Sequence, residues 1–178
     1  PESPKPQLKS GNATLNNAFI VKKDEFYTQY EDVVVEMMKH RSHLKGKTIL
    51  CNCDDPFESA FFRFFILHFD DLELSGLIST CYSESSLAGK EYPLSGGTSA
   101  YKAIVKEVPS DNLERPDGSL DLESLFAIPS NSLVHLSGNG DFRSKECEAL
   151  LQQADIIVTN PPFNLFREYI SLLMLHKK

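Results

Sequence analysis

Residues 144–163 read SKECEALLQQADIIVTNPPF, and this stretch decides the expected fold. Its apolar residues first recur at helical spacing and then form a β-branched run over 155–159, which predicts a helix followed at once by a strand. The stretch TILCNC at 48–53 predicts another short apolar strand that leads into a helix. Strands that alternate with helices predict an α/β fold whose doubly wound, mostly parallel sheet is covered on both sides. Ligands of such folds bind at the carboxyl ends of the strands.

Three further helices are expected around this sheet. Apolar residues at helical spacing predict one that Thr28 caps and that ends near Gly46. Asp55 is placed to cap a second helix, with Pro56 at its first position. This second helix contains six of the twelve phenylalanines on more than one face, which predicts burial on both sides. The third helix follows Phe163.

Two more strands and a long irregular stretch lie between these helices. Residues 76–82 and 133–136 predict the second and third strands. Residues 83–132 form an insertion that is rich in Ser, Gly and Pro. Its one strand-like piece, at 101–108, is expected to be half of a hairpin. Residues 1–15 contain three prolines and are expected to be a flexible tail.

The composition indicates a folded, soluble protein with an acidic surface. Its 18 Lys and Arg against 25 Asp and Glu give a net charge of -7, which excludes a basic nucleic-acid-coating protein. The longest apolar run, 61–69, is interrupted by Arg63 and His68 and is far shorter than the ~20 residues that span a bilayer, so no membrane contact is expected. The chain starts with neither Met nor a signal segment, so we expect a cut piece of a cytoplasmic protein.

Two other groups of residues have both a structural and a functional interpretation. Cys51, Cys53, Cys81 and Cys147 lack the paired spacing of a zinc site, so reduced core thiols are favoured over a disulfide or a bound metal. The basic run at 39–47 is favoured as a solvated helix end, and contact with a nucleic-acid backbone is the alternative.

The corner Asn160-Pro161-Pro162-Phe163 has a distinctive chemistry. Its prolines fix φ and remove two backbone donors, so the loop is stiff and its carbonyls point away from any strand ladder. The side-chain oxygen of Asn160 and the backbone oxygen of Pro161 can then accept both hydrogens of a planar amine, while Phe163 stacks on its ring. Such a grip localises the lone pair of the nitrogen and makes it a usable nucleophile. A plain strand-ending turn is the alternative, because Asn-Pro commonly starts turns.

These four residues resemble the catalytic motif of amino-group methyltransferases that use S-adenosylmethionine. Asp141 and Phe142 resemble a pair in which the acid receives the adenine amino group of the cofactor and the ring packs on it. With CNCDDP at 51–56, they make the chain similar to the EcoRI-type adenine-specific DNA methyltransferases from about residue 23 to 169. The residues implied for the cofactor are Phe26, Tyr27 and Thr28 in a segment that lines its pocket, Cys51, Cys53, Asp54 and Asp55 after the first strand, and Asp141 and Phe142.

The resemblance implies a class I methyltransferase (Rossmann-like) fold, of which residues 16–178 would be the N-terminal, cofactor-binding part. It also implies methyl transfer from S-adenosylmethionine to the exocyclic N6 amine of adenine in DNA, by in-line displacement without a metal, within a restriction-modification system. Only about four strands are predicted, so the sheet is incomplete and the loops that read bases would lie elsewhere. DNA is therefore expected to contact mainly that other part, and inactivity of this part alone is compatible with the resemblance.

The chain departs from the family pattern at two cofactor contacts. The loop at 51–56 has no glycine, so Asp54 or Asp55 is expected to contact the ammonium group of the cofactor, directly or through water. Helix capping is the competing role of Asp55. The second strand ends without the acid that commonly holds the ribose, and Tyr82 is either stacked on the adenine or a core residue.

Other functions stay open at the level of sequence. The same corner occurs in methyltransferases that act on glutamine side chains of proteins or on guanine amines of RNA, because each of these groups is a planar amine. A non-catalytic methyltransferase-like binding module would keep the fold without the reaction. Cofactor binding separates a module that no longer binds from an enzyme, and methyl transfer to DNA, RNA or protein separates the substrates.

Overall fold

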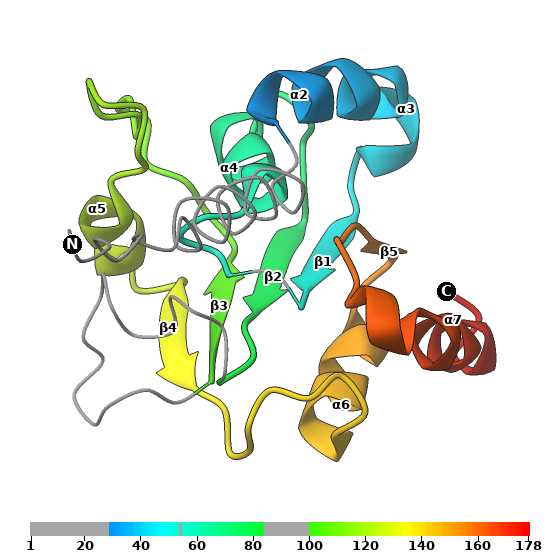
Figure 1. The fold of residues 1–178 in the computed structure, drawn as a ribbon. Helices are drawn as coiled ribbons and strands as arrows, with labels where there is room; N and C mark the ends of the chain where they lie inside the picture. The colour runs from blue at the N-terminus through cyan, green and yellow to red at the C-terminus, as the bar shows by residue number, and fades with distance from the viewer. Residues whose placement is uncertain (1–28, 54, 84–99) are drawn as a thin grey trace, which may run out of the picture.

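The computed structural model describes residues 29–53, 55–83 and 100–178. In this part of the chain, five strands form one sheet in the order β4-β3-β2-β1-β5 (Figure 1). The strands are β1 (Thr48–Asn52), β2 (Gly76–Thr80), β3 (Tyr101–Val105), β4 (Ser132–His135) and β5 (Ile156–Ile157). Each strand expected from the sequence is present, although β5 is shorter than the apolar run at 155–159 predicts.

The strands of this sheet do not all pair in the same way. β1 pairs in parallel with both β2 and β5, whereas β3 pairs antiparallel with β2 and with β4. Because β3 is reversed relative to both neighbours, β4 runs in the same direction as β1, β2 and β5. The expected mostly parallel sheet is therefore correct for the direction of four strands, while two of the four pairings are antiparallel.

β3 occupies an interior position that the sequence does not predict. Its residues 101–105 alternate between fully and partly buried, with Tyr101, Ala103 and Val105 in the core. The strand bonds to a neighbour on each side, and each connection is long: residues 81–100 link it to β2, and residues 106–131 link it to β4. β3 therefore pairs antiparallel with the strands before and after it, as the expected hairpin requires, but long connections and not tight turns join it to them.

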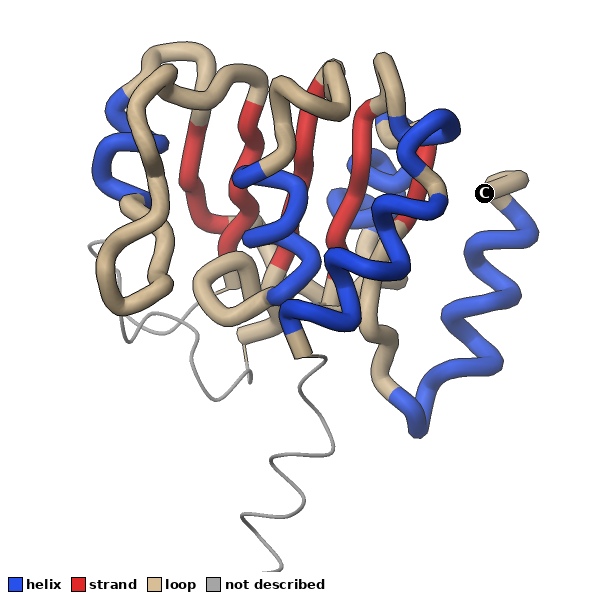
Figure 2. The backbone as a smooth tube through the Cα atoms, turned by 90° about the horizontal axis from the view of Figure 1, so that it is seen from above, coloured by secondary structure: helices blue, strands red, loops and turns tan. Residues whose placement is uncertain are grey.

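Helices cover both faces of the sheet (Figure 2). α2 (Tyr30–Lys39), α3 (Arg41–Leu44), α4 (Ala60–Leu67) and α5 (Leu122–Ala127) contribute to the core on one face, and α6 (Lys145–Gln153) covers the other. A 3-10 turn, η1 (Phe163–Leu165), leads into α7 (Phe166–Leu175), which lies beyond β5 and packs Leu172 and Leu173 against the α6 side. The covering of both faces agrees with the expected α/β arrangement.

β1 shows why a strand in this sheet is apolar along its whole length. Ile49 and Cys51 belong to the core on the α4 side, and Leu50 belongs to the core on the α6 side. All three are at most 1% exposed. Because successive side chains of a strand point to opposite faces, a strand covered on both sides needs a continuous apolar run, as the sequence has here.

The start of α4 differs from the sequence expectation. The Oγ of Ser59 accepts a hydrogen bond from the backbone N of Phe62 at 3.0 Å and caps the helix. Asp55 does not cap α4: its Oδ1 accepts the backbone N of Phe57 at 3.0 Å, which closes the turn before the helix, and also accepts the hydroxyl of Tyr101 at 2.7 Å. Pro56 lies in a turn that precedes the helix. The expected cap at Asp55 and the expected first helical position of Pro56 are therefore wrong.

The first helical segment is divided into two. α2 has Gln29 at its N-cap, and Thr28, the expected cap, lies outside the described residues. A break at His40 separates α2 from α3. The chain then reverses at Gly46, whose φ of +71° favours glycine, close to the expected end of the segment.

The basic run at 39–47 lies at the amino end of β1, the edge opposite to the carboxyl ends of the parallel strands. Two of its cations have acidic partners: Lys39 pairs with Glu36 at 2.7 Å and Lys45 pairs with Glu73 at 2.6 Å. These exposed pairs contribute little to stability, but they reduce the positive charge of the run. The arrangement favours the interpretation as a solvated helix end.

The cysteines are not linked in disulfides. All four are thiols, and Cys51, Cys81 and Cys147 are buried, as expected for core thiols. Burial raises the pKa of Cys81 to about 12 and also raises the pKa of Cys147. Within the described ranges, no three His, Cys, Asp or Glu side chains gather as the ligands of a metal ion would. None of the helices described there is both long enough and apolar enough to cross a membrane.

The phenylalanines of α4 make the stability of the fold testable. Phe65 is fully buried, whereas Phe61 on the same helix is partly buried. We expect Phe65→Ala to lower the free energy of unfolding by about 3–5 kcal/mol, because it leaves a cavity in the core. Phe61→Ala is the matched control and should cost less than half as much. Urea unfolding followed by circular dichroism measures both, and equal costs would contradict the burial described for α4.

Candidate functional site

The corner Asn160-Pro161-Pro162-Phe163 projects from the carboxyl edge of the sheet. The backbone N of Val158 still donates to the carbonyl of Leu50 at 2.9 Å, so the chain follows β1 for one residue beyond β5. The next residue, Thr159, donates its hydroxyl to the backbone carbonyl of Asn52 at the end of β1. Asn160 and both prolines are then half-buried, and Phe163 is 65% exposed. The corner is thus accessible rather than packed in the core.

Asn52 connects the end of β1 to α7. Its side chain is only 4% exposed, and its Oδ1 accepts a hydrogen bond from the hydroxyl of Tyr169 at 2.6 Å. Burial raises the pKa of Tyr169, so its hydroxyl stays protonated and acts as the donor. One residue therefore holds the chain before the corner, through Thr159, and the helix after it, through Tyr169.

Tyr169 also packs on the loop that follows β4. Its ring meets that of Phe142 edge to face, with centroids 5.2 Å apart and planes at 80°. Both side chains are buried, at 1% and 5% exposure. Aromatic pairs in this geometry stabilise beyond the area that they bury. The contact places the Asp141-Phe142 segment against the same helix that continues from the corner.

Gly140 brings this loop against the end of β2. Its φ is +80°, and an added Cβ would come within 2.2 Å of the carbonyl oxygen of Cys81, so a side chain does not fit. The backbone N of Ser83 donates to the carbonyl of Asn139 at 2.9 Å and ties the two segments together. This close approach places Asp141 at the carboxyl edge of the sheet.

Asp141 is held in place by Arg143. The guanidinium donates from Nε to Oδ1 at 2.9 Å and from Nη2 to Oδ2 at 2.6 Å. These hydrogen bonds hold the pKa of Asp141 below its usual value, so the carboxylate is ionised at neutral pH. The Nη1 of Arg143 also donates to Glu168 on α7 at 2.7 Å. The loop and α7 are thereby connected by charge as well as by ring packing.

The turn after β1 takes a left-handed conformation without glycine. Cys53 has a φ of +64°, which is uncommon for a residue with a side chain. Beyond it, Asp55 is buried and accepts the hydroxyl of Tyr101. Burial raises the pKa of Tyr101, so this hydroxyl also remains a donor. Asp54, the other acid of this turn, lies outside the described residues.

The predicted site residues converge only in part. The turn containing Cys53 and Asp55, the Asp141-Phe142 pair and the corner all follow strands that end at one edge of the sheet. Cys51 is fully buried in the core, so its side chain is a packing residue. Tyr82 is 36% exposed after β2 and is not a core residue. Phe26, Tyr27 and Thr28 lie outside the described residues.

The sequence interpretation misses the residues that hold the site together. Asn52, Thr159, Tyr169 and Arg143 are not among the predicted site residues, yet they make the contacts between the segments. A polar Asn52 at the end of an apolar strand is the one sequence signal that singles out any of them. The partner of Tyr169 is 117 residues away in the chain, so helical periodicity marks it only as apolar.

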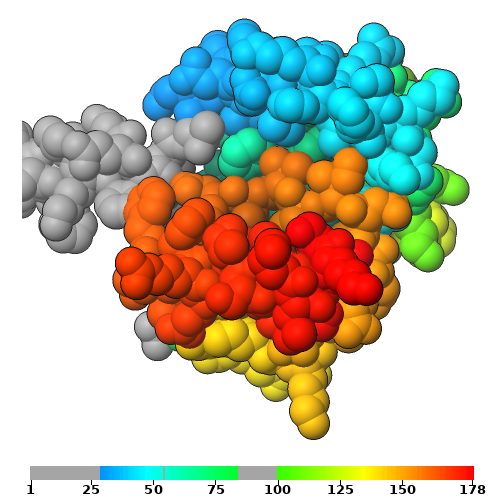
Figure 3. All heavy atoms as spheres, turned by 90° about the vertical axis from the view of Figure 1, so that its right-hand side faces the viewer, coloured from blue at the N-terminus to red at the C-terminus, as the bar shows by residue number. Residues whose placement is uncertain are grey.

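α7 forms the outer surface next to the corner. Figure 3 looks onto this helix and shows it outermost on that side of the molecule. Several large apolar side chains of the corner and the helix are exposed there: Phe163, Phe166, Ile170, Met174 and Leu175. The aromatic ring of the corner is thus part of a larger apolar surface.

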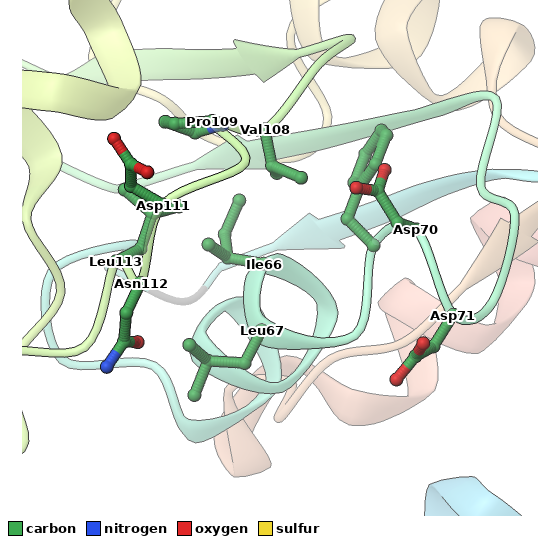
Figure 4. Close-up of a pocket in the computed structure, with 10 residues that line it drawn as sticks. Ile66, Leu67, Asp70, Asp71, Val108, Pro109, Asp111, Asn112 and Leu113 are labelled. Carbon is green, nitrogen blue, oxygen red and sulfur yellow. The ribbon is translucent and has the colours of Figure 1, made fainter.

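Two hollows in the described part of the chain lie away from this edge. One cavity of about 190 Å³ lies between the end of α4 and the loop after β3 (Figure 4). Asp111 and Asp70 stand on opposite sides of it, so their carboxylates do not converge on one point. A second hollow, of about 480 Å³, is lined by residues of α2, α3 and the segment before β2. Both belong to the amino-terminal edge of the parallel strands.

Residues 14–178 match the family model described as adenine-specific methyltransferase EcoRI. The chain belongs to this family. This membership confirms the resemblance drawn from the Asn-Pro-Pro-Phe corner and the segments around it.

Three curated relatives are similar over nearly the whole chain. Identity is 38% over 167 residues to the type II methyltransferase M.EcoRI of Escherichia coli, covering 94% of this chain and 47% of that protein. It is 34% to M.MpnI of Mycoplasma pneumoniae and 33% to M.MgeORF184P of Mycoplasma genitalium, each covering 92% of this chain and 41% of the relative. The chain thus spans less than half the length of these relatives. No solved structure matches it significantly.

The glycine contact at the end of β2 provides a test of the site geometry. We expect Gly140→Ala to lower the free energy of unfolding by about 2 kcal/mol or more, because the new Cβ meets the Cys81 carbonyl and φ is positive. Gly138→Ala, two residues earlier, has open space around it and should change stability by less than about 0.5 kcal/mol. Chemical denaturation compares the two, and equal stabilities would contradict the close approach.

Proposed function

We propose that this chain is the cofactor-binding and catalytic part of an S-adenosylmethionine-dependent DNA methyltransferase that modifies the N6 amine of adenine. The observation that supports it most is the corner at the carboxyl edge, where Asn160 is accessible and Phe163 is exposed. Family membership supports the same conclusion, and the relatives are named type II methyltransferases. A role in restriction-modification is part of this proposal.

The topology supports a Rossmann-like class I fold as the finer assignment. β1 has β2 on one side and β5 on the other, and it is parallel to both. The chain therefore leaves β1 in one direction and later returns to its other side, which makes β1 the switch point of the sheet. Ligands of open α/β sheets bind in the crevice outside the carboxyl ends at such a point. In this chain, that is where Asn52 and the corner meet.

The corner is suited to hold a planar amine. Its two prolines have no N–H, so neither can donate a backbone hydrogen bond in competition with an amine for the oxygens of Asn160 and Pro161. Accepting both amine hydrogens localises the nitrogen lone pair and stabilises the charge that grows on nitrogen during attack. A base in a duplex must first be extruded, which costs a few kcal/mol, and stacking on Phe163 would return about 1–3 kcal/mol.

The residues at the edge fit the methyl donor that the family implies. Bound S-adenosylmethionine supplies a methyl group on a sulfonium centre, which is a good leaving group. Asp141 is ionised and fixed by Arg143, whose backbone N and Nε both donate to Oδ1 at 2.8 and 2.9 Å. Its Oδ2 accepts only Nη2 from that residue, at 2.6 Å, and has a second lone pair that can accept the adenine amino group of the cofactor. Asp55 is already engaged with Tyr101, so Asp54 is the stronger candidate for the ammonium group.

DNA is proposed as the partner, with its sequence-reading contacts outside this chain. The net charge of -7 gives the chain no general attraction for phosphate. The basic run at 39–47 lies at the opposite edge from the corner, and its Lys39 and Lys45 are paired with acids. A cytoplasmic location is part of the same proposal, because the DNA substrate is there.

The proposal is tested with the full-length protein and S-adenosylmethionine labelled in its methyl group. We expect label in the N6 position of adenine in DNA and none in RNA or protein. Label in protein glutamine or RNA guanine would favour the other amine substrates of the same corner. Cofactor binding without transfer to any of the three would indicate a binding module instead.

Asn160→Ala tests the assigned role of the corner. We expect methyl transfer to fall by about 100-fold or more, because one of the two acceptors for the amine is lost, while the calorimetric Kd for the cofactor stays within about twofold. Asn164→Ala is the matched control, since this exposed asparagine lies just beyond the corner. Unchanged turnover in Asn160→Ala would overturn the assignment.

A further inference from the structure

Two hydrogen bonds, one before and one after the corner, reach the same residue at the end of β1. Before the corner, the hydroxyl of Thr159 donates to the backbone carbonyl of Asn52. After the corner, the hydroxyl of Tyr169 donates to the side-chain Oδ1 of Asn52 at 2.6 Å. Asn52 and Tyr169 are at most 4% exposed, so water does not replace these bonds easily.

The rest of the corner offers few backbone bonds to the sheet. β5 contributes only Ile156 and Ile157 to the ladder, and the last strand-like bond, from Val158 to Leu50, comes two residues before Asn160. Pro161 and Pro162 have no N–H to donate. The position of the corner relative to the end of β1 therefore depends strongly on the two bonds at Asn52.

We propose that Asn52 is a positioning residue that fixes the height and angle of the Asn-Pro-Pro-Phe corner over the end of β1. This inference rests on the proposed function of the corner. Asn52 acts through the hydrogen bonds that it accepts from Thr159 and Tyr169. None of the three needs to touch the substrate for this role.

Positioning matters here because the reaction needs an aligned attack. Reacting atoms must stand about 3–3.5 Å apart in a near-attack geometry, and a misplacement of about 1 Å can lower a rate by about 100-fold. A corner that moves away from β1 would still bind a base, but the amine would be out of line with the methyl donor bound at the strand ends. The expected defect is therefore in kcat and not in affinity.

The first test removes each of these two hydrogen bonds while nearly keeping the shape of the side chain that donates it. Thr159→Val replaces the hydroxyl by a methyl group, and Tyr169→Phe removes the hydroxyl but keeps the ring that packs on Phe142. In the full-length protein, we expect each variant to lower kcat by about tenfold while the Kd of S-adenosylmethionine and the KM for DNA change by less than about twofold. Thr159→Ser keeps a hydroxyl and should restore most of the kcat.

Two controls separate positioning from general destabilisation. Tyr30→Phe removes a tyrosine hydroxyl from α2, on the far layer of the fold, and should leave kcat unchanged. Asn131→Ala removes a buried amide with four hydrogen bonds at 2.8–3.2 Å at the opposite edge of the sheet. It should lower the unfolding temperature at least as much as Tyr169→Phe without lowering kcat at 25 °C.

The outcomes distinguish this inference from the proposed function. If the unaltered protein transfers no methyl group, the proposed function fails. If it transfers methyl groups and both Thr159→Val and Tyr169→Phe keep the normal kcat, the positioning role of Asn52 is wrong and the function stands. A loss of kcat in Asn131→Ala equal to that in Tyr169→Phe would also overturn the inference, because destabilisation alone would then explain the defect.

Discussion

The structure depends on the burial of β1 between two layers of helices. Its apolar residues pack alternately on the α4 side and on the α6 side, and the strand pairs in parallel with a neighbour at each edge. A strand with no exposed face and no free edge is the most constrained place in an α/β sheet. Asn52 is the last residue of this strand and is fixed by the same packing. It accepts hydrogen bonds from Thr159, which follows the two-residue strand β5, and from Tyr169 on the surface helix α7. A polar residue buried in such a position is stabilising only because both its oxygens receive hydrogen bonds.

Much of the fold and some of the site are predictable from the sequence. Apolar runs and helical spacing predict the strands and most helices, because each is a local pattern. The corner is recognisable because two adjacent prolines after a β-branched strand leave little other choice of conformation. The capping of α4 is not predictable in this way: Asp55 and Ser59 are both good caps, and in the structure Asp55 closes the preceding turn while Ser59 caps the helix. The contact of Asp55 with Tyr101, 46 residues away in sequence, is not predictable from a local pattern either. The order of the strands is also not local, so the pattern at 101–108 does not indicate that β3 lies between β2 and β4.

The contacts around the site describe a small cooperative unit. Tyr169 on α7 packs on Phe142 in the loop after β4 and donates its hydroxyl to Asn52 at the end of β1. Arg143 joins the same loop to Glu168 on α7. Each link joins segments that are distant in sequence, so the contacts together hold the loop, α7 and β1 against one another. The carboxyl edge is therefore organised by contacts between side chains of three segments.

The reversed strand β3 also sets the distance between β4 and β2. Neighbouring strands lie about 4.8 Å apart, so an interposed strand moves β4 from one spacing to two spacings away from β2. The loop after β4 must then travel back across the end of β3 before Asp141 can stand near β1. This crossing begins after Leu136, whose backbone N donates to the carbonyl of Ala100. It ends at Gly140, which packs against the carbonyl of Cys81 at the end of β2. Residues 137–139 must therefore be long enough to cross the end of β3. A deletion there would leave Asp141 above β3.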